Sequence, residues 1–506
     1  MSALDTTKII GIVGAGAMGA GMAQVAASAG HPVLLYDADE NAATKGIART
    51  ASGLDKLVAR ERISQQQRDD LIARIKPVQS LQDLAPASLV IEAIVEDLAI
   101  KQSVFQQLEA ICSDDTILAS NTSSISITAI AAALNKPQRF AGMHFFNPAP
   151  IMKLVEIISG LATDKAIADT LFELATDWGK KAVHVKSSPG FIVNRVARPF
   201  YAEALRILQE GAASPQTIDA ILRGCGNFRM GPFELMDLIG HDVNYAVTQS
   251  VFDAFYGDSR FTPSLLQKER VDAGFLGVKS GRGFYDYAEG SSKPEADYCP
   301  AQTFDSPVYM TGRGDWVQAF AEMIQSHGIT LNRSSSDDCI LQSEFFTLCQ
   351  SDGRMATLRA EQENLSNLIL FDLSIDYITS SLIVLAAADQ TDTVAVDKAV
   401  GFFQRLGKQV ILVDDIAGMC LMRTVCMLAN EAADTVNQQV CSSEAVDTAM
   451  QAGVNYPLGP LAWADRIGIR KVLEVLDNLQ DHYGEDRYRA SPLLIRKAAA
   501  GSRFHD

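Results

Sequence analysis

The sequence has few cysteines, fewer basic than acidic residues and few long apolar runs. Each of these shortages excludes a class of protein. Its eight cysteines form no CxxC pair and no cluster with histidine, so neither a disulfide framework nor a zinc site is indicated. We expect no bound metal and a reducing, cytoplasmic compartment. The 61 acidic residues outnumber 44 basic ones, and the net charge of −17 argues against non-specific binding to nucleic acid or anionic membranes.

One apolar run is long enough on paper to cross a bilayer, but its composition argues against a membrane span. Residues Ile9 to Gly30 carry no charge, yet six of them are glycine, and Asp5 precedes the run. The first residues, MSALDTTK, lack the basic character of a signal peptide. We therefore expect no membrane partner and look for another reason for the glycines.

The glycines fit a nucleotide-binding turn. Ile9 to Val13 reads as a buried strand, followed by Gly14-Ala15-Gly16-Ala17-Met18-Gly19 and a helix of small residues. In a βαβ unit the first glycine forms a tight turn, the second admits a pyrophosphate, and the third lets helix and strand pack closely. A second strand, Pro32 to Tyr36, ends in Asp37, whose carboxylate would accept hydrogen bonds from a ribose hydroxyl. This order predicts a Rossmann-like domain that prefers NAD to NADP; a purely conformational glycine turn is the alternative.

Polar residues follow the next two expected strands. Leu89 to Val95 ends at Glu96, and Lys101 lies near the start of the next helix. Thr116 to Ser120 is followed by a loop that contains Ser123. Ligands bind at the carboxyl ends of strands in open parallel sheets, so these side chains are candidate contacts, although Ser123 fits a helix cap equally well.

Three basic residues lie near the turn between two expected helices, namely Lys56, Arg60 and Arg62. A solvated charged face is the plain interpretation of such a group. A site for substrate phosphates is the alternative.

A histidine and a glutamate occupy two further expected strands. His144 lies near the end of Arg139 to Phe145, the turn-forming pair Asn147-Pro148 follows, and Glu156 lies in the apolar run Ile151 to Ile158. A histidine suits proton transfer at a secondary alcohol in both directions, and a neighbouring carboxylate fixes its tautomer and stabilises the imidazolium. A core histidine beside a strand-edge charge would also explain the pattern. The upstream dinucleotide motif favours the acid/base interpretation.

The helical region that follows occurs twice. The sequence from Trp178, WGKKAVHVKSSPGFIVNR, returns from Leu406 as LGKQVILVDDIAGMCLMR, in a register that aligns Gly179 with Gly407. The same register pairs Asp219 with Asp447 further on. Self-similarity over this length indicates a duplicated domain.

The sequence of the segment between the two helical regions indicates a degenerate copy of the first domain. Val308 to Val317, VYMTGRGDWV, retains two of the three glycines, and Arg333 ends the expected second strand where an aspartate would be. Leu382 to Ala388 is expected in the place of the His144 strand but carries no histidine. The register of the repeat aligns Asn194 with Met422. A second cofactor site, in which Arg333 binds a 2′-phosphate, is the less favoured alternative.

We therefore expect an α/β Rossmann-like dinucleotide-binding domain followed by an all-α domain, with this arrangement repeated in degenerate form. The expected domains are an NAD-binding Rossmann domain (1–187), a helical substrate and dimerisation domain (188–290), a degenerate Rossmann-like domain (291–415) and a second helical domain (416–506).

Five motifs in this order, GAGAMG, SNTSS, MHFFNP, LVEII and PGFIVNR, resemble the NAD-dependent 3-hydroxyacyl-CoA dehydrogenase family. In length and doubled helical domain the chain is most similar to the bacterial 3-hydroxyadipyl-CoA enzymes of phenylacetate degradation, and next to 3-hydroxybutyryl-CoA dehydrogenases of fatty-acid or butanoate metabolism. The resemblance implies oxidation of an (S)-3-hydroxyacyl-CoA substrate to 3-oxoacyl-CoA, with NAD as cofactor. A non-catalytic NAD-binding homologue and a dehydrogenase of hydroxy acids without CoA are the alternatives.

The resemblance also implies roles for residues. His144 and Glu156 match the catalytic dyad, and Ser123 and Asn194 match residues that hydrogen-bond the substrate oxygen. Lys56 falls near the lysine that binds the CoA phosphates. The positions that match cofactor contacts are Gly14, Gly16, Met18, Gly19, Asp37, Glu96, Lys101, Asn147 and Lys279.

Two further expectations concern partners. Helical domains in this family pair between subunits, so the two copies are expected to form an intramolecular pseudo-dimer, with a homodimer of chains left open. A dicarboxylic acyl group would need a cation in its pocket, and Arg195, Arg198 and Arg229 are unranked candidates. The absence of histidine and Asn194 from the second copy predicts a single active site.

Overall fold

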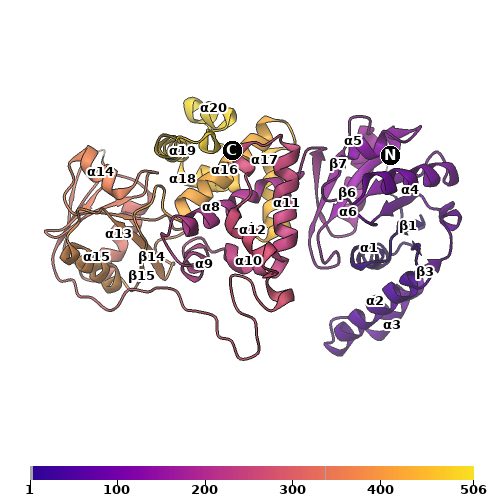
Figure 1. Cartoon of the computed structure of the whole chain (residues 1–506), viewed down its shortest axis with the longest axis horizontal. Coiled ribbons are helices and arrows are strands. Elements are labelled where there is room, and N and C mark those ends of the chain that lie inside the picture. Colours follow the sequence, from indigo (N-terminus) through magenta and orange to yellow (C-terminus); the bar gives the residue numbers. More distant parts are fainter. Residues whose placement is uncertain (1–3, 337, 506) are drawn as a thin grey trace. The chain divides into compact units, whose positions relative to one another are not determined.

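The computed structural model describes residues 4–336 and 338–505. It divides the chain into two compact units, Met1–Arg195 with Gln438–Val454, and Val196–Asn437 with Asn455–Asp506 (Figure 1). Within the described residues, no helix is long and apolar enough to cross a bilayer.

The first unit is built on an eight-stranded sheet in the order β3-β2-β1-β4-β5-β6-β7-β8. Neighbouring strands are parallel except β6 and β7, which are antiparallel. The strands are β1 (Ile10–Val13), β2 (Val33–Tyr36), β3 (Ile75–Val78), β4 (Leu89–Glu92), β5 (Ile117–Ser120), β6 (Phe140–Phe145), β7 (Leu154–Ser159) and β8 (Lys181–Lys186). The helices are α1 (Ala17–Ser28), α2 (Ala42–Ala59), α3 (Gln65–Arg74), α4 (Leu98–Ile111), α5 (Ile127–Ala131), α6 (Lys165–Asp177), α7 (Val193–Val196) and α17 (Ser443–Val454).

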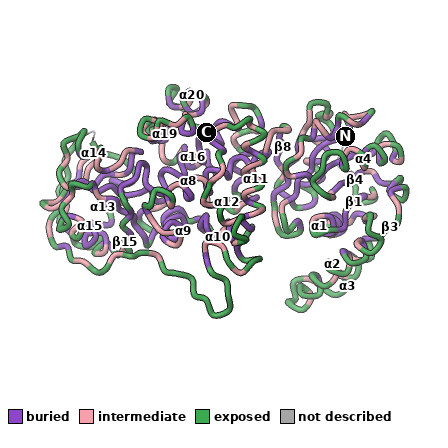
Figure 2. The backbone as a smooth tube through the Cα atoms, viewed as in Figure 1, coloured by how far each residue is buried: buried purple, intermediate pink, exposed green. Residues whose placement is uncertain are grey.

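The central strands of this sheet form its core. Every residue of β1, β4, β5 and β6 is buried, because helices cover both faces of a parallel sheet and leave no face for polar side chains (Figure 2). The helical pair α2 and α3 is mostly exposed in the same view. The fold confirms the predicted Rossmann arrangement, with parallel strands on either side of the glycine turn.

Two predictions for this unit are wrong, one about the end of a strand and one about the number of strands. β4 ends at Glu92 rather than Val95, because the Glu92 carboxylate accepts a hydrogen bond from the Ile94 N–H (2.6 Å) and turns the chain. Glu96 therefore lies in the loop beyond the strand. β3, which was not predicted at all, starts at Ile75, directly after α3.

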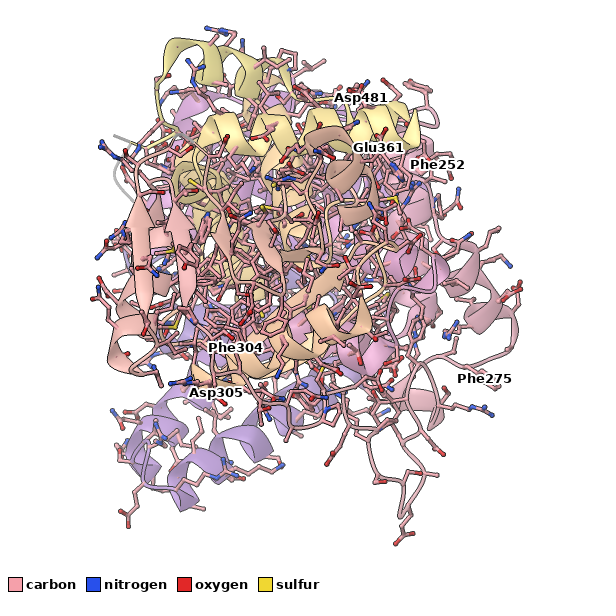
Figure 3. The ribbon with its side chains drawn as sticks, turned by 90° about the vertical axis from the view of Figure 1, so that its left-hand side faces the viewer. Phe252, Phe275, Phe304, Asp305, Glu361 and Asp481 are labelled. Carbon is pink, nitrogen blue, oxygen red and sulfur yellow. The ribbon has the colours of Figure 1, made fainter. Side chains whose placement is uncertain are left out.

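The second unit contains a smaller, seven-stranded sheet in the order β10-β9-β11-β12-β13-β14-β15. Its strands are β9 (Val308–Thr311), β10 (Leu331–Ser334), β11 (Leu341–Gln342), β12 (Thr347–Gln350), β13 (Leu368–Phe371), β14 (Leu382–Ala387) and β15 (Gln409–Leu412). The helices around this sheet are α13 (Asp315–Ser326), α14 (Ala356–Glu363) and α15 (Thr393–Arg405). The segment before β9 contains Phe304 and Asp305 (Figure 3). It is held against α15, because Arg405 donates to the Phe304 carbonyl (3.0 Å) and pairs with Asp305 (3.3 Å).

The second sheet corrects two expectations about the degenerate copy of the first domain. β14 pairs with β13 in antiparallel and with β15 in parallel, as β7 does with β6 and β8, so it is the counterpart of the Glu156 strand and not of the His144 strand. β10 continues past Arg333 to Ser334, which pairs with Thr311, the last residue before Gly312. Ser335, not Arg333, therefore stands where Asp37 stands in the first sheet.

The remaining helices of the second unit come from both helical copies. They are α8 (Arg198–Gln209), α9 (Pro215–Gly224), α10 (Pro232–Ile239), α11 (His241–Ala254) and α12 (Leu265–Asp272), and from the second copy α16 (Leu421–Asn437), α18 (Pro460–Ile467), α19 (Ile469–Tyr483) and α20 (Pro492–Ala500). α8 packs on α16, which is the contact that intramolecular pairing of the two copies predicts.

One helix of each helical copy packs against the sheet of the other copy. In the first unit α17 packs on β7 and β8, and the Val440 carbonyl accepts from the Lys186 N–H (2.8 Å). In the second unit α9, the counterpart of α17 in the sequence repeat, packs on β14, and the Cys225 carbonyl accepts from the Ile375 N–H (2.8 Å). This reciprocal exchange is the behaviour of two subunits joined in one polypeptide.

Candidate active site

The turn between β1 and α1 has the shape that a pyrophosphate requires. Gly14 has a φ of +101°, in the region that favours glycine, and a side chain at Gly19 would lie 1.7 Å from the Gly14 carbonyl oxygen. Gly16, by contrast, faces open space, with nothing within 4 Å of a built Cβ. Gly14 therefore serves the turn and Gly19 the helix packing, and the approach of a phosphate to Gly16 stays a prediction that the open space allows.

The start of α1 and the end of β2 complete this dinucleotide site. The first turn of α1 contains no acidic residue, so its N–H groups face the turn without a competing charge. The half-buried Asp37 accepts a hydrogen bond from the Ala15 N–H (2.6 Å), which fixes its carboxylate beside the glycine turn. These donors and this acceptor fit the pyrophosphate and ribose of NAD.

A network of buried charge lies between β4, α4 and β5. Glu92, which sequence reasoning missed, accepts from Lys101 Nζ (2.6 Å) and from Ser120 Oγ (2.7 Å). Lys101 is also paired with Glu96 (3.1 Å) and is almost completely buried. A charged residue inside the apolar sequence LVIEAIV was the available signal for Glu92, because a buried carboxylate requires a partner. Lys101 thus has a structural role here, and its contact with the cofactor stays a prediction.

Glu96 organises the loop that carries Ser123. Its Oε1 accepts from Thr122 Oγ1 (2.7 Å), the Ser123 N–H (2.8 Å) and Ser123 Oγ (3.3 Å). Burial alone would raise the pKa of Glu96, but the hydrogen bond from Thr122 and the charge of Lys101 lower it below its ordinary value. The helix cap that was one of the two interpretations of Ser123 is provided by Ser126, which accepts from the Ala129 N–H. Ser123 is therefore left to other partners.

His144 and Glu156 face one another across two antiparallel strands. They are register partners on β6 and β7, and Nδ1 of His144 lies 2.7 Å from Glu156 Oε2. Both are buried, with exposed fractions of 6% and 1%. A carboxylate can only accept, so Nδ1 carries the proton and Nε2 remains free to act as a base. The phenyl rings of Phe146 and Phe191 lie beside the imidazole and limit its movement.

The second oxygen of Glu156 holds the helix that follows the sheet. Oε1 accepts from the Ile192 N–H (3.0 Å) and the Val193 N–H (3.1 Å), at the start of α7. That helix carries Asn194, whose Nδ2 donates to the Ser123 carbonyl oxygen (3.4 Å). One carboxylate therefore orients the histidine and anchors the segment that brings Asn194 to Ser123.

The roles of three predicted residues, Asn147, Lys56 and Lys279, stay predictions. Asn147 is exposed in the turn after β6, and Lys56 is exposed on α2. Lys279 belongs to the second unit, where it pairs with Asp242 (2.5 Å). Asn121, which was not predicted, accepts from the Phe145 N–H (2.8 Å) and so fixes the strand end next to His144.

The second sheet carries a carboxylate where the first carries the dyad. Asp372 accepts hydrogen bonds from the Cys420, Leu421 and Met422 N–H groups, at 3.0, 2.7 and 2.9 Å. Burial raises the pKa of Asp372 to about 6, against the effect of these hydrogen bonds. Asp315 lies in the first turn of α13, where it would repel a phosphate. This arrangement supplies neither a base nor a phosphate site of the kind found in the first unit.

Comparisons with known proteins agree with this architecture. Residues 9–188 match the family model "3-hydroxyacyl-CoA dehydrogenase, NAD binding domain", and residues 190–287 and 418–503 match "3-hydroxyacyl-CoA dehydrogenase, C-terminal domain". Residues 348–416 match "3-hydroxybutyryl-CoA dehydrogenase reduced Rossmann-fold domain". The two matches to one helical domain confirm its duplication.

Three relatives are informative. A 3-hydroxyadipyl-CoA dehydrogenase of Escherichia coli (strain K12) is 44% identical over 497 residues, which are 98% of each chain. A probable 3-hydroxybutyryl-CoA dehydrogenase of Bacillus subtilis (strain 168) is 45% identical over 56% of this chain and 99% of its own. The crystal structure of a 3-hydroxybutyryl-CoA dehydrogenase from Escherichia coli K12 substr. MG1655 has a TM-score of 0.90 and 42% identity, over 98% of this chain and 99% of that one.

Proposed function

The chain belongs to the 3-hydroxyacyl-CoA dehydrogenase family and is an NAD-dependent oxidoreductase, and from this premise we propose that its preferred substrate is (S)-3-hydroxyadipyl-CoA. The relative named for that substrate matches this chain from end to end, including the degenerate second half. Relatives named for 3-hydroxybutyryl-CoA include a single-copy protein of about half the length and a full-length solved structure, so this substrate is the alternative.

We propose that His144 is the general base of the reaction. The carrying observation is the buried contact of 2.7 Å between His144 Nδ1 and Glu156 Oε2, which leaves Nε2 free to take the proton of the substrate hydroxyl. Glu156 stabilises the imidazolium that forms, because its carboxylate stays beside Nδ1. The turn of Gly14 to Gly19 would hold NAD, which would supply the acceptor for the hydride from the same carbon.

Two more side chains are proposed to hold the reacting oxygen. Ser123 Oγ and Asn194 Nδ2 lie on segments that are joined by the hydrogen bond between Asn194 and Ser123. Asn194 has a second amide hydrogen for an oxygen that gains negative charge, and Ser123 would donate to it by turning its hydroxyl away from the long contact with Glu96 (3.3 Å). In the reverse reaction the protonated His144 returns its proton to that oxygen. Lys56, exposed on α2, is proposed to contact the CoA phosphates.

A kinetic comparison tests both parts of this proposal. We expect a higher kcat/KM for 3-hydroxyadipyl-CoA than for 3-hydroxybutyryl-CoA, and the opposite order would replace the proposed substrate by the alternative. We expect His144→Gln to lower kcat for both substrates by about 10²- to 10⁴-fold, with NAD binding retained. Turnover at the wild-type rate would exclude His144 as the base.

The compartment is a further proposal. All eight cysteines are free thiols in the structure, which supports the reducing cytoplasm. Fractionation of the source cells, with the activity followed in each fraction, tests this expectation.

A further inference from the structure

Arg49 on α2 reaches the nucleotide turn of the first unit. Its Nη2 donates to the carbonyl oxygen of Ala15 (2.9 Å), the second residue of the turn between β1 and α1. α2 approaches this turn closely because Gly46, one helical turn before Arg49, has no side chain. A Cβ built at Gly46 would lie 3.0 Å from the same carbonyl oxygen. Residues three apart share one face of a helix, so Arg49 lies on the face of α2 that packs against the turn.

Two side chains of opposite charge hold Ala15. Its N–H donates to Asp37 Oδ2 (2.6 Å), and its carbonyl accepts from Arg49. The nitrogen and the oxygen of one residue are only about 3 to 4 Å apart, so the carboxylate and the guanidinium lie within about 10 Å of one another. In a dinucleotide-binding domain the acidic residue at the end of the second strand marks the ribose 2′-position. Arg49 therefore places a positive charge near that position.

The positive charge of Arg49 is available to a ligand. Among residues 4–336 and 338–505, no carboxylate forms an ion pair with it, and its neighbours one helical turn away on α2, Lys45 and Gly53, are not acidic. Arg49 is exposed, and its hydrogen bond to Ala15 uses only one of the five N–H donors of a guanidinium. The contact with Ala15 keeps the other donors beside the turn, where they can bind a phosphate at two points.

We propose that Arg49 determines, together with Asp37, the choice between NAD and NADP. The carboxylate of Asp37 repels a 2′-phosphate and so disfavours NADP. The guanidinium of Arg49 attracts the same phosphate, so NADP binds once the carboxylate is removed. The preference for NAD thus depends on a single acidic residue, in a site that already carries a cation for the 2′-phosphate.

Equilibrium binding of NADH and NADPH to the full chain, followed by nicotinamide fluorescence, tests this role. The measurement uses no acyl-CoA, so its outcome is independent of the proposed substrate and of His144. Asp37→Ser removes the carboxylate and keeps a hydroxyl that can accept from the Ala15 N–H. We expect this variant to bind NADPH about 10- to 100-fold more tightly than the wild type does.

The effect of Arg49 is then measured in the Asp37→Ser background. Arg49→Met should weaken the binding of NADPH by about 10- to 100-fold, as expected for loss of a hydrogen bond to a charged group. The same substitution should weaken the binding of NADH by about fivefold at most, because NADH has no 2′-phosphate for the guanidinium to bind. Arg49→Lys keeps the charge without the planar fork and should retain part of the affinity for NADPH.

Arg74→Met is the matched control. Arg74 is also exposed and also donates to a backbone carbonyl of α1, that of Ala27 (3.3 Å), near the other end of the helix. In the Asp37→Ser background this control should leave both dissociation constants unchanged. Because it removes the same group and the same kind of contact, it separates the position of Arg49 from its chemistry.

The comparison of the two cofactors separates binding of the 2′-phosphate from support of the turn. If Arg49→Met weakens NADH and NADPH by the same factor, Arg49 only holds the turn and the proposal is wrong. The proposal is also wrong if Arg49→Met weakens neither cofactor, or if Asp37→Ser gains no affinity for NADPH. Thermal unfolding shows whether each variant is folded, and if Arg49→Met is not, Arg49→Lys in the same background decides between these outcomes.

Discussion

Asp372 occupies in the second sheet the position that His144 occupies in the first. His144 is the register partner of Glu156, and the Asp372 N–H donates to the carbonyl of Val384 (3.0 Å), which is the counterpart of Glu156 in the sequence repeat. The duplicated chain therefore replaced the histidine by an acid and the glutamate by an apolar residue, so the pair that could transfer a proton was lost.

The replacement kept a structural contact. Glu156 accepts from the N–H groups of Ile192 and Val193, and Asp372 accepts from Cys420 and Leu421, which are their counterparts. In both copies a buried carboxylate thus binds the start of the helix that follows the sheet, where the helix dipole favours negative charge. The contact belongs to the fold, and the histidine is what the first copy adds to it.

Asp372→Asn should weaken the fold without touching the active site. An amide turns an NH₂ group toward backbone donors, so at least one of these N–H groups loses its acceptor, and the free energy of unfolding, measured by thermal unfolding, should fall by about 1 to 3 kcal/mol. Because burial raises the folded pKa of Asp372 to about 6, above the unfolded value, ionisation costs the wild type stability as the pH rises, so the loss should be largest below about pH 5 and smaller above pH 6. The kcat of the folded protein should not change.

Asp305→Asn provides the control for this variant. Asp305 is an exposed residue whose pairing with Arg405 is of the surface kind, which contributes little to stability (Figure 3). Equal losses of Tm in the two variants would contradict the anchoring role of Asp372.

Glu156→Gln separates the two roles of that residue. The amide oxygen can still accept from Ile192 and Val193, while the amide nitrogen faces His144 and favours the tautomer that has no free base at Nε2. We expect kcat to fall by about 10²- to 10⁴-fold with a small change in Tm. A large loss of Tm with kcat preserved would show that Glu156 acts on the fold alone.

Two glycines of the nucleotide turn should respond differently to alanine. A methyl group at Gly16 meets no protein atom, so Gly16→Ala should keep its Tm and raise the KM for NAD roughly tenfold by occupying space for the pyrophosphate. A methyl group at Gly19 would clash with the Gly14 carbonyl, so Gly19→Ala should also lose about 1 to 3 kcal/mol of stability. Gly53→Ala, in open space on α2, is the control. Identical behaviour of Gly16→Ala and Gly19→Ala would refute this division of roles.

Local patterns in the sequence predicted the parts of the site that depend on spacing. The glycines, Asp37, and the facing pair His144 and Glu156 follow from strand and turn periodicity, and the internal repeat predicted the doubled helices. Arg423, which pairs with Glu203, and Asp372 could not be singled out in this way. Their roles depend on contacts between segments far apart in the chain, which no local pattern encodes.

The exchange of α17 and α9 between the sheets is a second example. Both helices are amphipathic, and an amphipathic pattern does not identify the sheet against which a helix packs. Packing decides which sheet each one covers. The domain limits drawn from sequence therefore place α17 with the second helical copy, whereas the structure groups it with the first sheet.

The ion pair between Glu203 and Arg423 gives the last prediction. Glu203 on α8 and Arg423 on α16 are almost completely buried, with Nε of the arginine 2.7 Å from the carboxylate, so the pair joins one helical copy to the other. Glu203→Gln leaves Arg423 with a weaker partner in a buried site, and we expect a loss of about 3 to 5 kcal/mol near neutral pH. Glu485→Gln, at the exposed pair with Arg206, should lose much less.

The pH dependence of this loss identifies the charge. Burial raises the pKa of Glu203, but the charges of Arg423, Arg487 and Arg206 lower this pKa by more than burial raises it. The folded pKa therefore lies below the ordinary value of about 4.3. A lowered pKa means that the ionised carboxylate stabilises the folded state above the unfolded pKa, and that this stabilisation is lost as the pH falls through the folded pKa. The Tm difference between wild type and Glu203→Gln should therefore be constant from about pH 8 to 5 and shrink below about pH 4. A difference that does not change with pH would mean that Glu203 contributes packing and not charge to the joint between the copies.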